Sequence, residues 1–330
     1  MTRARLRSGS FFQSDAVQRL LAFSALLLII VVFSLLSPYF ATQSNAITIL
    51  TATAVNGILA IGVTFVIISG GIDLSVGTVM ALCAVMTGKL VTDMGLPLPI
   101  GVVGAILTGG LMGLLNGVLI ARFKIPPFIA TLGTMQIARG LALVLADLAP
   151  IYFNDTPDFN QVAMGSFVGS LIPGFNIPNV VLVFFGAAVI AAFILGRTIL
   201  GRYTFAIGSN EEATRLSGVK VVRWKTAVYV VSGLFAGLAG VVIAARLNSA
   251  QPAQGMGFEL DAIAAAVIGG TSLSGGEGTI LGTVIGAFII STLTNGLRIW
   301  GVPQEWQFVV TGGIVVLAVY LDIVRRRRQA

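Results

Sequence analysis

The stretch TFVIISGGIDLSVGTVMAL, residues 64–82, places a glycine-rich turn with one acid between two apolar runs. These runs are parts of two longer apolar segments, 46–69 and 73–90. A helix of about 17 to 25 apolar residues crosses the hydrocarbon core of a bilayer. Glycine lets two backbones approach closely and adopt unusual dihedral angles. The stretch therefore predicts two membrane helices joined by a tight turn.

The rest of the chain has the same character. Of its 330 residues, 56% are hydrophobic, 10% are charged and 40 are glycine, which leaves too little polar surface to cover a water-soluble globule. We expect an all-α polytopic integral membrane protein with about ten transmembrane helices, some of them short or broken. The predicted spans are 17–37, 46–69, 73–90, 98–120, 128–147, 178–196, 226–245, 261–275, 279–297 and 305–323.

Two of these spans, the eighth and the first, differ from the others. The eighth is apolar over few residues before the glycine-rich GGTSLSGGEGT at 269–279, so we expect it to enter only part of the bilayer. The first follows several arginines, as a signal peptide would, but it lacks a small-residue cleavage site and is long enough to span. We interpret it as a retained helix. The chain then divides into a cytoplasmic segment at 1–19, a transmembrane domain at 20–324 and a basic cytoplasmic tail at 325–330.

The basic residues predict the orientation, because cytoplasmic flanks retain positive charge. An N-terminus inside the cell puts 16 of the 20 basic residues on the cytoplasmic side. Both termini and the loop 197–225 are then cytoplasmic, and 148–177, which follows directly on Asp147, is the longest external loop. The residues on the cytoplasmic side are Arg3, Arg5, Arg7, Arg19, Arg122, Lys124, Arg197, Arg202, Arg215, Lys220, Arg223, Lys225 and Arg325, Arg326, Arg327 and Arg328.

Several kinds of chemistry are disfavoured. The chain has no histidine, a single cysteine at Cys83 and no paired-carboxylate or metal-ligand motif, so we expect no catalytic residue and no metal site. It also lacks G-x-x-x-x-G-K-[ST], so it cannot bind ATP through a P-loop. The net charge of +7 reports membrane orientation and lipid contact rather than nucleic acid, because no basic run is interleaved with aromatic residues.

A second glycine-rich turn, IGGTSLSGGEGT at 268–279, resembles SGGIDLSVGT at 69–78. Aligning Gly70 with Gly269 pairs Gly71 with Gly270, and also pairs Leu74 with Leu273 and Ser75 with Ser274. A parallel repeat and simple convergence of glycine-rich turns both explain the likeness. In either case we expect the four glycines to be buried near a pathway or at its inner mouth.

Polar residues near the spans are candidates for a pathway or gate. Asp73 is the one acid within an apolar hairpin, so it is either functional, together with Ser75, or a cap for the following helix. Arg139 lies within a span and is equally ambiguous. The segment NSAQPAQGMGFELDA at 248–262 is a candidate outer gate, although its acids also suit a helix N-terminus. Its candidate residues are Asn248, Gln251, Glu259 and Asp261. For the amides within the spans, Asn56, Asn116, Gln136 and Asn295, packing competes with a pathway role.

The charged stretch IGSNEEATRLSGVKVVRWK, residues 207–225, predicts a short helix that begins after Ser209 or Asn210 and stops at Gly218. Glu211 and Glu212 suit its N-terminal dipole, and Ala213 and Leu216 lie three apart. The segment is either a solvated connector or a docking helix for a soluble partner.

Five ordered blocks make the chain resemble the permease subunits of bacterial ATP-binding-cassette (ABC) importers for monosaccharides, most closely the ribose-type permeases. They are TFVIISGGIDLSVGTVMAL (64–82), IPPFIATLGTMQIARGLA (125–142), GRYTFAIGSNEEATRLSGVKV (201–221), SGLFAGLAGVVIAARLNSAQP (232–252) and GFELDAIAAAVIGGTSLSGGEGTILGTVIGA (257–287).

The resemblance implies a permease in the bacterial inner membrane that carries a ribose-like pentose or small hexose. It implies a second permease copy, a periplasmic sugar-binding protein, and an ATPase chain with tandem nucleotide domains that binds ATP and Mg. It also implies that a coupling helix seats in the ATPase, although Thr214 stands where the family pattern has a second alanine. The coupling residues are Ser209, Asn210, Glu211, Glu212, Ala213, Thr214, Arg215, Leu216 and Gly218. An ion-coupled secondary transporter is the alternative, with Asp73 and Arg139 as its available ionisable groups.

Overall fold

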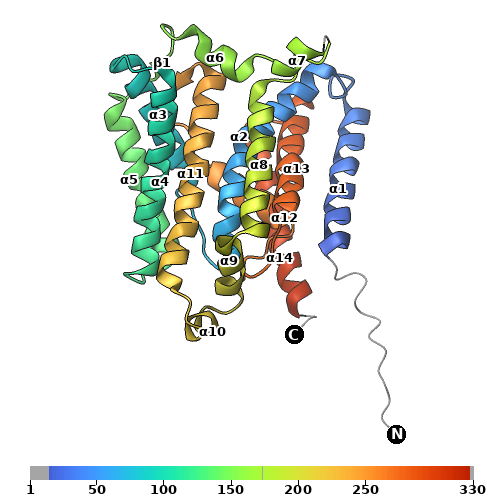
Figure 1. The fold of residues 1–330 in the computed structure, drawn as a ribbon. Coiled ribbons are helices and arrows are strands. Elements are labelled where there is room, and N and C mark those ends of the chain that lie inside the picture. The colour runs from blue at the N-terminus through green and yellow to red at the C-terminus, as the bar shows by residue number, and fades with distance from the viewer. Residues whose placement is uncertain (1–14, 173, 328–330) are drawn as a thin grey trace.

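The computed structural model describes residues 15–172 and 174–327 of the chain. The first 14 residues of the predicted N-terminal segment and residues 328–330 of the predicted tail lie outside the described residues. Within the described ranges the long helices run side by side as one bundle (Figure 1). The helices are α1 (Asp15–Leu36), α2 (Gln43–Ile68), α3 (Val76–Gly88), α4 (Leu98–Ala121), α5 (Pro127–Leu145), α6 (Pro157–Met164), α7 (Phe167–Leu171), α8 (Asn179–Arg197), α9 (Ile199–Ser209), α10 (Glu211–Leu216), α11 (Val221–Leu247), α12 (Phe258–Ile268), α13 (Ile280–Ile299) and α14 (Gln304–Arg327).

Each of the ten predicted spans overlaps a helix, which confirms the all-α polytopic fold. Seven helical segments of the described chain are long and apolar enough to cross a membrane, and α1 holds a shorter apolar stretch at Leu20–Leu36. The seven are α2, α3 with the π-helical turn Lys89–Asp93, α4, α5, α8, α11 and α13.

The eighth predicted span, 261–275, is wrong in its extent. α12 has 11 residues, ends at Ile268 and is followed by the glycine-rich turn. At 1.5 Å per residue it rises about 16 Å, roughly half of a bilayer's hydrocarbon core. The expectation that this element enters only part of the bilayer agrees with this length.

α2 forms the centre of the bundle. Every residue from Thr53 to Ser69 is buried, and α8, α11, α12 and α13 pack around it. By contrast, α4, α5 and α8 expose large apolar side chains on one face, such as Leu111, Ile137 and Val189. A helix that is apolar all round lies inside the bundle, and the exposed apolar faces suit contact with lipid.

α4 and α11 approach each other closely through glycine. A Cβ atom on Gly109 would collide with the Gly233 carbonyl oxygen, and one on Gly113 would collide with the Tyr229 carbonyl oxygen. The glycines of α4 recur every four residues and so share one face of the helix. This small-residue contact lets the two backbones touch, as is common between membrane helices.

The two ends of the bundle differ. α9 and α10 lie at one end, where α14 also finishes, and α6 and α7 cross the opposite end (Figure 1). At that opposite end β1 (Ile151–Tyr152) pairs antiparallel with β2 (Ser249–Ala250), so that Ile151 faces Ala250. The backbone N–H of Phe153 also donates to the Asn248 carbonyl at 3.3 Å. These bonds hold the predicted external loop 148–177 to the segment that follows α11.

Candidate functional site

The two glycine-rich turns meet at the α10 end of the bundle. The backbone N–H of Gly276 in the second turn donates to the Ile68 carbonyl at the end of α2, at 2.8 Å. An ideal Cβ on Gly275 would lie 3.0 Å from the Gly70 nitrogen. Two segments about 200 residues apart in sequence therefore form a single structural unit.

The turns share one backbone geometry, but in a different register from the sequence alignment. Gly70 has φ 78° and Gly270 has φ 93°, and each donates to the carbonyl three residues earlier at 2.9 Å. Pairing Gly70 with Gly269 is therefore wrong: the left-handed residue that ends α2 corresponds to Gly270, which ends α12. The helix-ending geometry fixes this register because only glycine adopts the left-handed conformation without strain.

The four glycines of the two turns were expected to be buried, and only two of them are. Gly71 and Gly269 are buried, Gly270 is half-buried and Gly70 is exposed. Gly70 is exposed because it turns the chain at the end of the bundle, where few neighbouring atoms cover it. Among the described residues, a Cβ there would come within 4 Å of the Gly208 Cα alone, at 4.0 Å.

α9 packs directly on the paired turns. A Cβ on Gly208 would collide with the Ile68 carbonyl oxygen and would lie 2.6 Å from the Gly276 nitrogen. Helix propensity and residue spacing do not reveal this contact, and Gly208 was not among the predicted site residues. Gly208 lies in the last turn of α9 without the left-handed conformation that ends a helix, so the close approach of the turns accounts for a glycine here.

α10 follows α9 after one residue. Asn210 caps α10, because the Ala213 N–H donates to Asn210 Oδ1 at 2.9 Å, whereas Ser209 is the last residue of α9. The predicted stop at Gly218 agrees with a φ of 84°. The described helix, Glu211–Leu216, has six residues.

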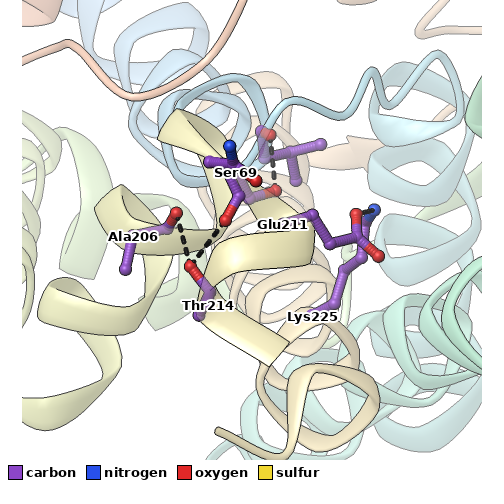
Figure 2. A network of polar contacts seen from close by, with 7 residues as sticks. Ser69, Ala206, Glu211, Thr214 and Lys225 are labelled. Atoms are coloured by element: carbon purple, nitrogen blue, oxygen red, sulfur yellow. Dashed lines mark hydrogen bonds and ion pairs between the residues drawn. The ribbon is translucent and has the colours of Figure 1, made fainter. Parts of the chain in front are cut away.

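Thr214 is the buried residue of α10. Its Oγ1 donates at 2.8 Å toward the Asn210 carbonyl within the helix and toward the Ala206 carbonyl in α9 (Figure 2). Glu211 meets Lys225 of α11 at 2.7 Å in the same view. α10 is thus tied to both of its neighbouring helices.

The other face of α10 is open. Glu212 and Arg215 pair with each other at 2.6 Å on the surface. Ala213 is exposed, and Leu216 has 79% of its surface exposed. The face of α10 that carries Leu216 is therefore accessible from outside the described chain.

Asp73 belongs to a buried polar network. Its Oδ1 accepts from the Ser75 hydroxyl at 2.6 Å and from the Ser75 backbone N–H at 3.0 Å, and its Oδ2 accepts from Ser232 at 3.1 Å. Asn116 donates to Ser75 Oγ at 2.9 Å and accepts from Thr134 at 2.6 Å. The network links α4, α5 and α11 to the start of α3. The capping interpretation predicts that the Asp73 carboxylate accepts a backbone N–H at the start of α3, and it accepts the N–H of Ser75. The N-cap position itself is occupied by Ser75.

The predicted gate segment 248–262 runs inward from the α6 end. Asn248, with φ 51°, ends α11, and Gln251 donates to Ser249 at 3.0 Å. Glu259 accepts from the Gly257 N–H at 3.1 Å, and both it and Asp261 lie in the first turn of α12.

The start of α12 lies beside the start of α3. A Cβ on Gly77 would collide with the Gly255 carbonyl and would lie 2.6 Å from a Glu259 carboxylate oxygen. Two helices that begin inside the bundle therefore meet at their N-termini. Broken helices of this kind frame binding sites in many transporters.

The remaining candidates are spread out. Arg139 lies half-buried on the peripheral helix α5, and Gln136 is exposed there. Among the described residues, no three His, Cys, Asp or Glu side chains gather closely enough to hold a metal ion.

Comparison with known proteins identifies the family. Residues 45–319 match the family model described as branched-chain amino acid transport system / permease component. The ribose import permease protein RbsC of Bacillus subtilis is 44% identical over 93% of each chain, and that of Escherichia coli is 40% identical over 98% of this chain and 99% of its own. The D-allose transport system permease protein AlsC of Escherichia coli is 41% identical over 91% of this chain and 90% of its own. No solved structure matches. The chain therefore belongs to the family of branched-chain amino acid transport system permease components, within which it is similar to ribose-type sugar permeases.

Proposed function

We propose that this chain is the membrane-spanning subunit of an ABC importer for a monosaccharide, either a ribose-like pentose or a small hexose. The names of its relatives, which transport ribose, allose, arabinose and xylose, support this substrate class. One structural observation carries the mechanism. The unit formed by α9 and α10 packs through Gly208 on both glycine-rich turns and presents an open face with Leu216.

Energy comes from a separate ATPase subunit. The chain has no P-loop sequence, so ATP and Mg bind the partner, which carries tandem nucleotide-binding domains. Movement of that partner pulls on α10, and the contacts of Thr214 and Gly208 pass the movement to the turns after α2 and α12. The coupling residues are Ser209, Asn210, Glu211, Glu212, Ala213, Thr214, Arg215, Leu216 and Gly218.

The opposite end receives a periplasmic sugar-binding protein. The pairing of β1 with β2 joins 148–177 to the segment after α11 into one surface. Two permease copies form the central path in the bacterial inner membrane, with both termini cytoplasmic. Asp73 and Ser75 hold the start of α3 in position, while Asn248, Gln251, Glu259 and Asp261 form an outer gate where α12 begins.

Purification of the tagged chain from its host tests the partners. A tandem-domain ATPase and a periplasmic sugar-binding protein are expected in the eluate, and uptake into vesicles should require ATP and resist an uncoupler. Replacing 209–218 by a flexible linker should leave membrane insertion intact and abolish uptake. Uptake by the chain alone in vesicles without ATP, abolished by an uncoupler, would establish an ion-coupled transporter instead.

A glycine substitution tests the contact that carries the mechanism. Gly208→Ala introduces a Cβ where backbone atoms of both turns lie, so sugar uptake should fall strongly while α10 still binds the ATPase. Gly196→Ala is the matched control, because a Cβ there meets no atom within 4 Å. ATP hydrolysis and uptake are measured together in reconstituted vesicles. Equal uptake by the two variants would show that α9 does not transmit movement through Gly208.

A further inference from the structure

A polar cavity lies among α2, α11, α12 and α13. Its volume is about 300 Å³. Residues near the α6 end of three helices line it, namely Thr48 of α2, Arg246 of α11 and Arg298 of α13, and so does the start of α12. It therefore extends from the outer part of the bundle to the place where α12 begins.

Two buried amides that line this cavity each have an oxygen without a hydrogen-bond partner. Asn56 of α2 is 6% exposed and Asn295 of α13 is 7% exposed. Within the described part of the chain, neither Oδ1 atom accepts a hydrogen bond from another group. An unsatisfied buried polar atom costs stability, so these two amides require a polar partner inside the cavity.

The polar groups around the cavity include both donors and acceptors. Arg246 and Arg298 only donate, Asp261 accepts, and Asn56 and Asn295 do both. A metal ion would need acceptors alone, and an anion would need donors alone. A hydroxyl group donates and accepts at once, so a molecule with several neutral hydroxyls fits this mixture.

The wall of the cavity also has an apolar part. Val55, Ile243 and Ile290 line it and are almost fully buried. A sugar ring has C–H groups as well as hydroxyls, and ligand pockets combine an apolar lining with a few placed polar groups. The size is at the lower end of the range for small-ligand pockets, which suits a single sugar ring.

We infer that this cavity is a binding site for a neutral monosaccharide within the permease, in which Asn56 and Asn295 bond to the sugar hydroxyls. The inference rests on the proposed function, because it places a sugar on the route inward from the outer surface. It adds a site in this chain to the recognition that the binding protein provides.

Protection of an introduced cysteine tests the site. Cys83 is fully buried, so the native chain should react little with a neutral thiol reagent, whereas Thr294→Cys places a thiol in the cavity wall. In the assembled transporter, D-ribose, D-allose, L-arabinose and D-xylose are each added before labelling. At least one of them should slow labelling of the Thr294→Cys variant.

Second substitutions link the protection to the amides. In the Thr294→Cys background, Asn295→Leu or Asn56→Leu should weaken sugar protection about tenfold, the effect of losing one hydrogen bond. Labelling without sugar at the rate of the Thr294→Cys parent shows that each variant is folded. Gln136→Leu is the control, because Gln136 is exposed on α5 outside the cavity, and it should leave protection unchanged.

The outcomes separate the site from the proposed function. ATP-driven uptake with no protection by any sugar would overturn the site and leave the importer standing. Protection by ribose 5-phosphate but not by ribose would indicate an anion site and overturn the inference. Sugar protection that the Leu variants weaken supports the site, even if uptake proves independent of ATP.

Discussion

At the scale of single residues, the structure shows what Thr214 does where the chain departs from the pattern that the resemblance implies. The resemblance to ABC permeases implies an alanine at this position, and a threonine there weakens the likeness on sequence alone. In the structure the hydroxyl joins α10 to α9 by donating to the Ala206 carbonyl, eight residues earlier. A threonine in a helix commonly bonds to the carbonyl four residues earlier, and the bond to Ala206 is additional. The substitution therefore adds a tie between the two helices.

Replacing the hydroxyl tests this tie. Thr214→Val keeps the shape and removes the bond, which contributes about 1 kcal/mol. We expect the variant to assemble with its ATPase and to import less sugar for each ATP hydrolysed. Thr214→Ser keeps the hydroxyl and should retain the wild-type ratio. The ratio is measured in reconstituted vesicles, and a wild-type value for Thr214→Val would show that the bond between α9 and α10 plays no part in coupling.

At the scale of elements, hydropathy was sufficient to predict the helices but not how they pack. Each of the ten apolar segments overlaps a helix, and seven helical segments of the described chain are long and apolar enough to cross a bilayer. The glycine face of α4 was missed, although Gly109, Gly113 and Gly117 show the G-x-x-x-G spacing that would have revealed it. α6 and α7 escaped prediction because they are short and lie in a loop rich in proline, asparagine and glycine. The register predicted between the two glycine-rich turns was wrong, because identical residues in two segments do not imply the same backbone conformation.

The contact between α4 and α11 gives a prediction about stability. Gly113→Leu places a side chain against the backbone of Tyr229 and Val230, which cannot move aside as a flexible side chain can. Overpacking in a core costs about 1–3 kcal/mol, so the variant should unfold at a lower temperature in detergent and give a lower yield. Gly133→Leu on α5 is the control, since a Cβ there meets nothing within 4 Å. If both variants unfolded at the same temperature as the wild type, α4 and α11 would not be in backbone contact.

At the scale of the whole molecule, the two ends have different chemistry. At the end that carries α10, α9 holds Arg202 and the first turn of α11 holds Arg223, whereas α6 at the opposite end holds Asp158. The sequence was sufficient to predict this asymmetry because charge and span order are both linear properties. It could not predict the polar cavity, whose groups come from four helices far apart in the chain. The proximity of Asn56, Arg246, Asp261 and Asn295 depends on how the helices pack, and no local pattern records it.

The asymmetry predicts the orientation in the membrane, which two single cysteines can test. Ser217 follows α10 and Ser170 lies in α7 at the opposite end; both are exposed, and the native Cys83 is fully buried. With the basic end inside, a membrane-impermeant thiol reagent added to spheroplasts should label Ser170→Cys at once and label Ser217→Cys only after the membrane is permeabilised. The unmodified chain serves as the background. Labelling of Ser217→Cys in intact spheroplasts would place α10 outside, where no cytoplasmic ATPase can reach it, and would contradict both the orientation and the proposed coupling.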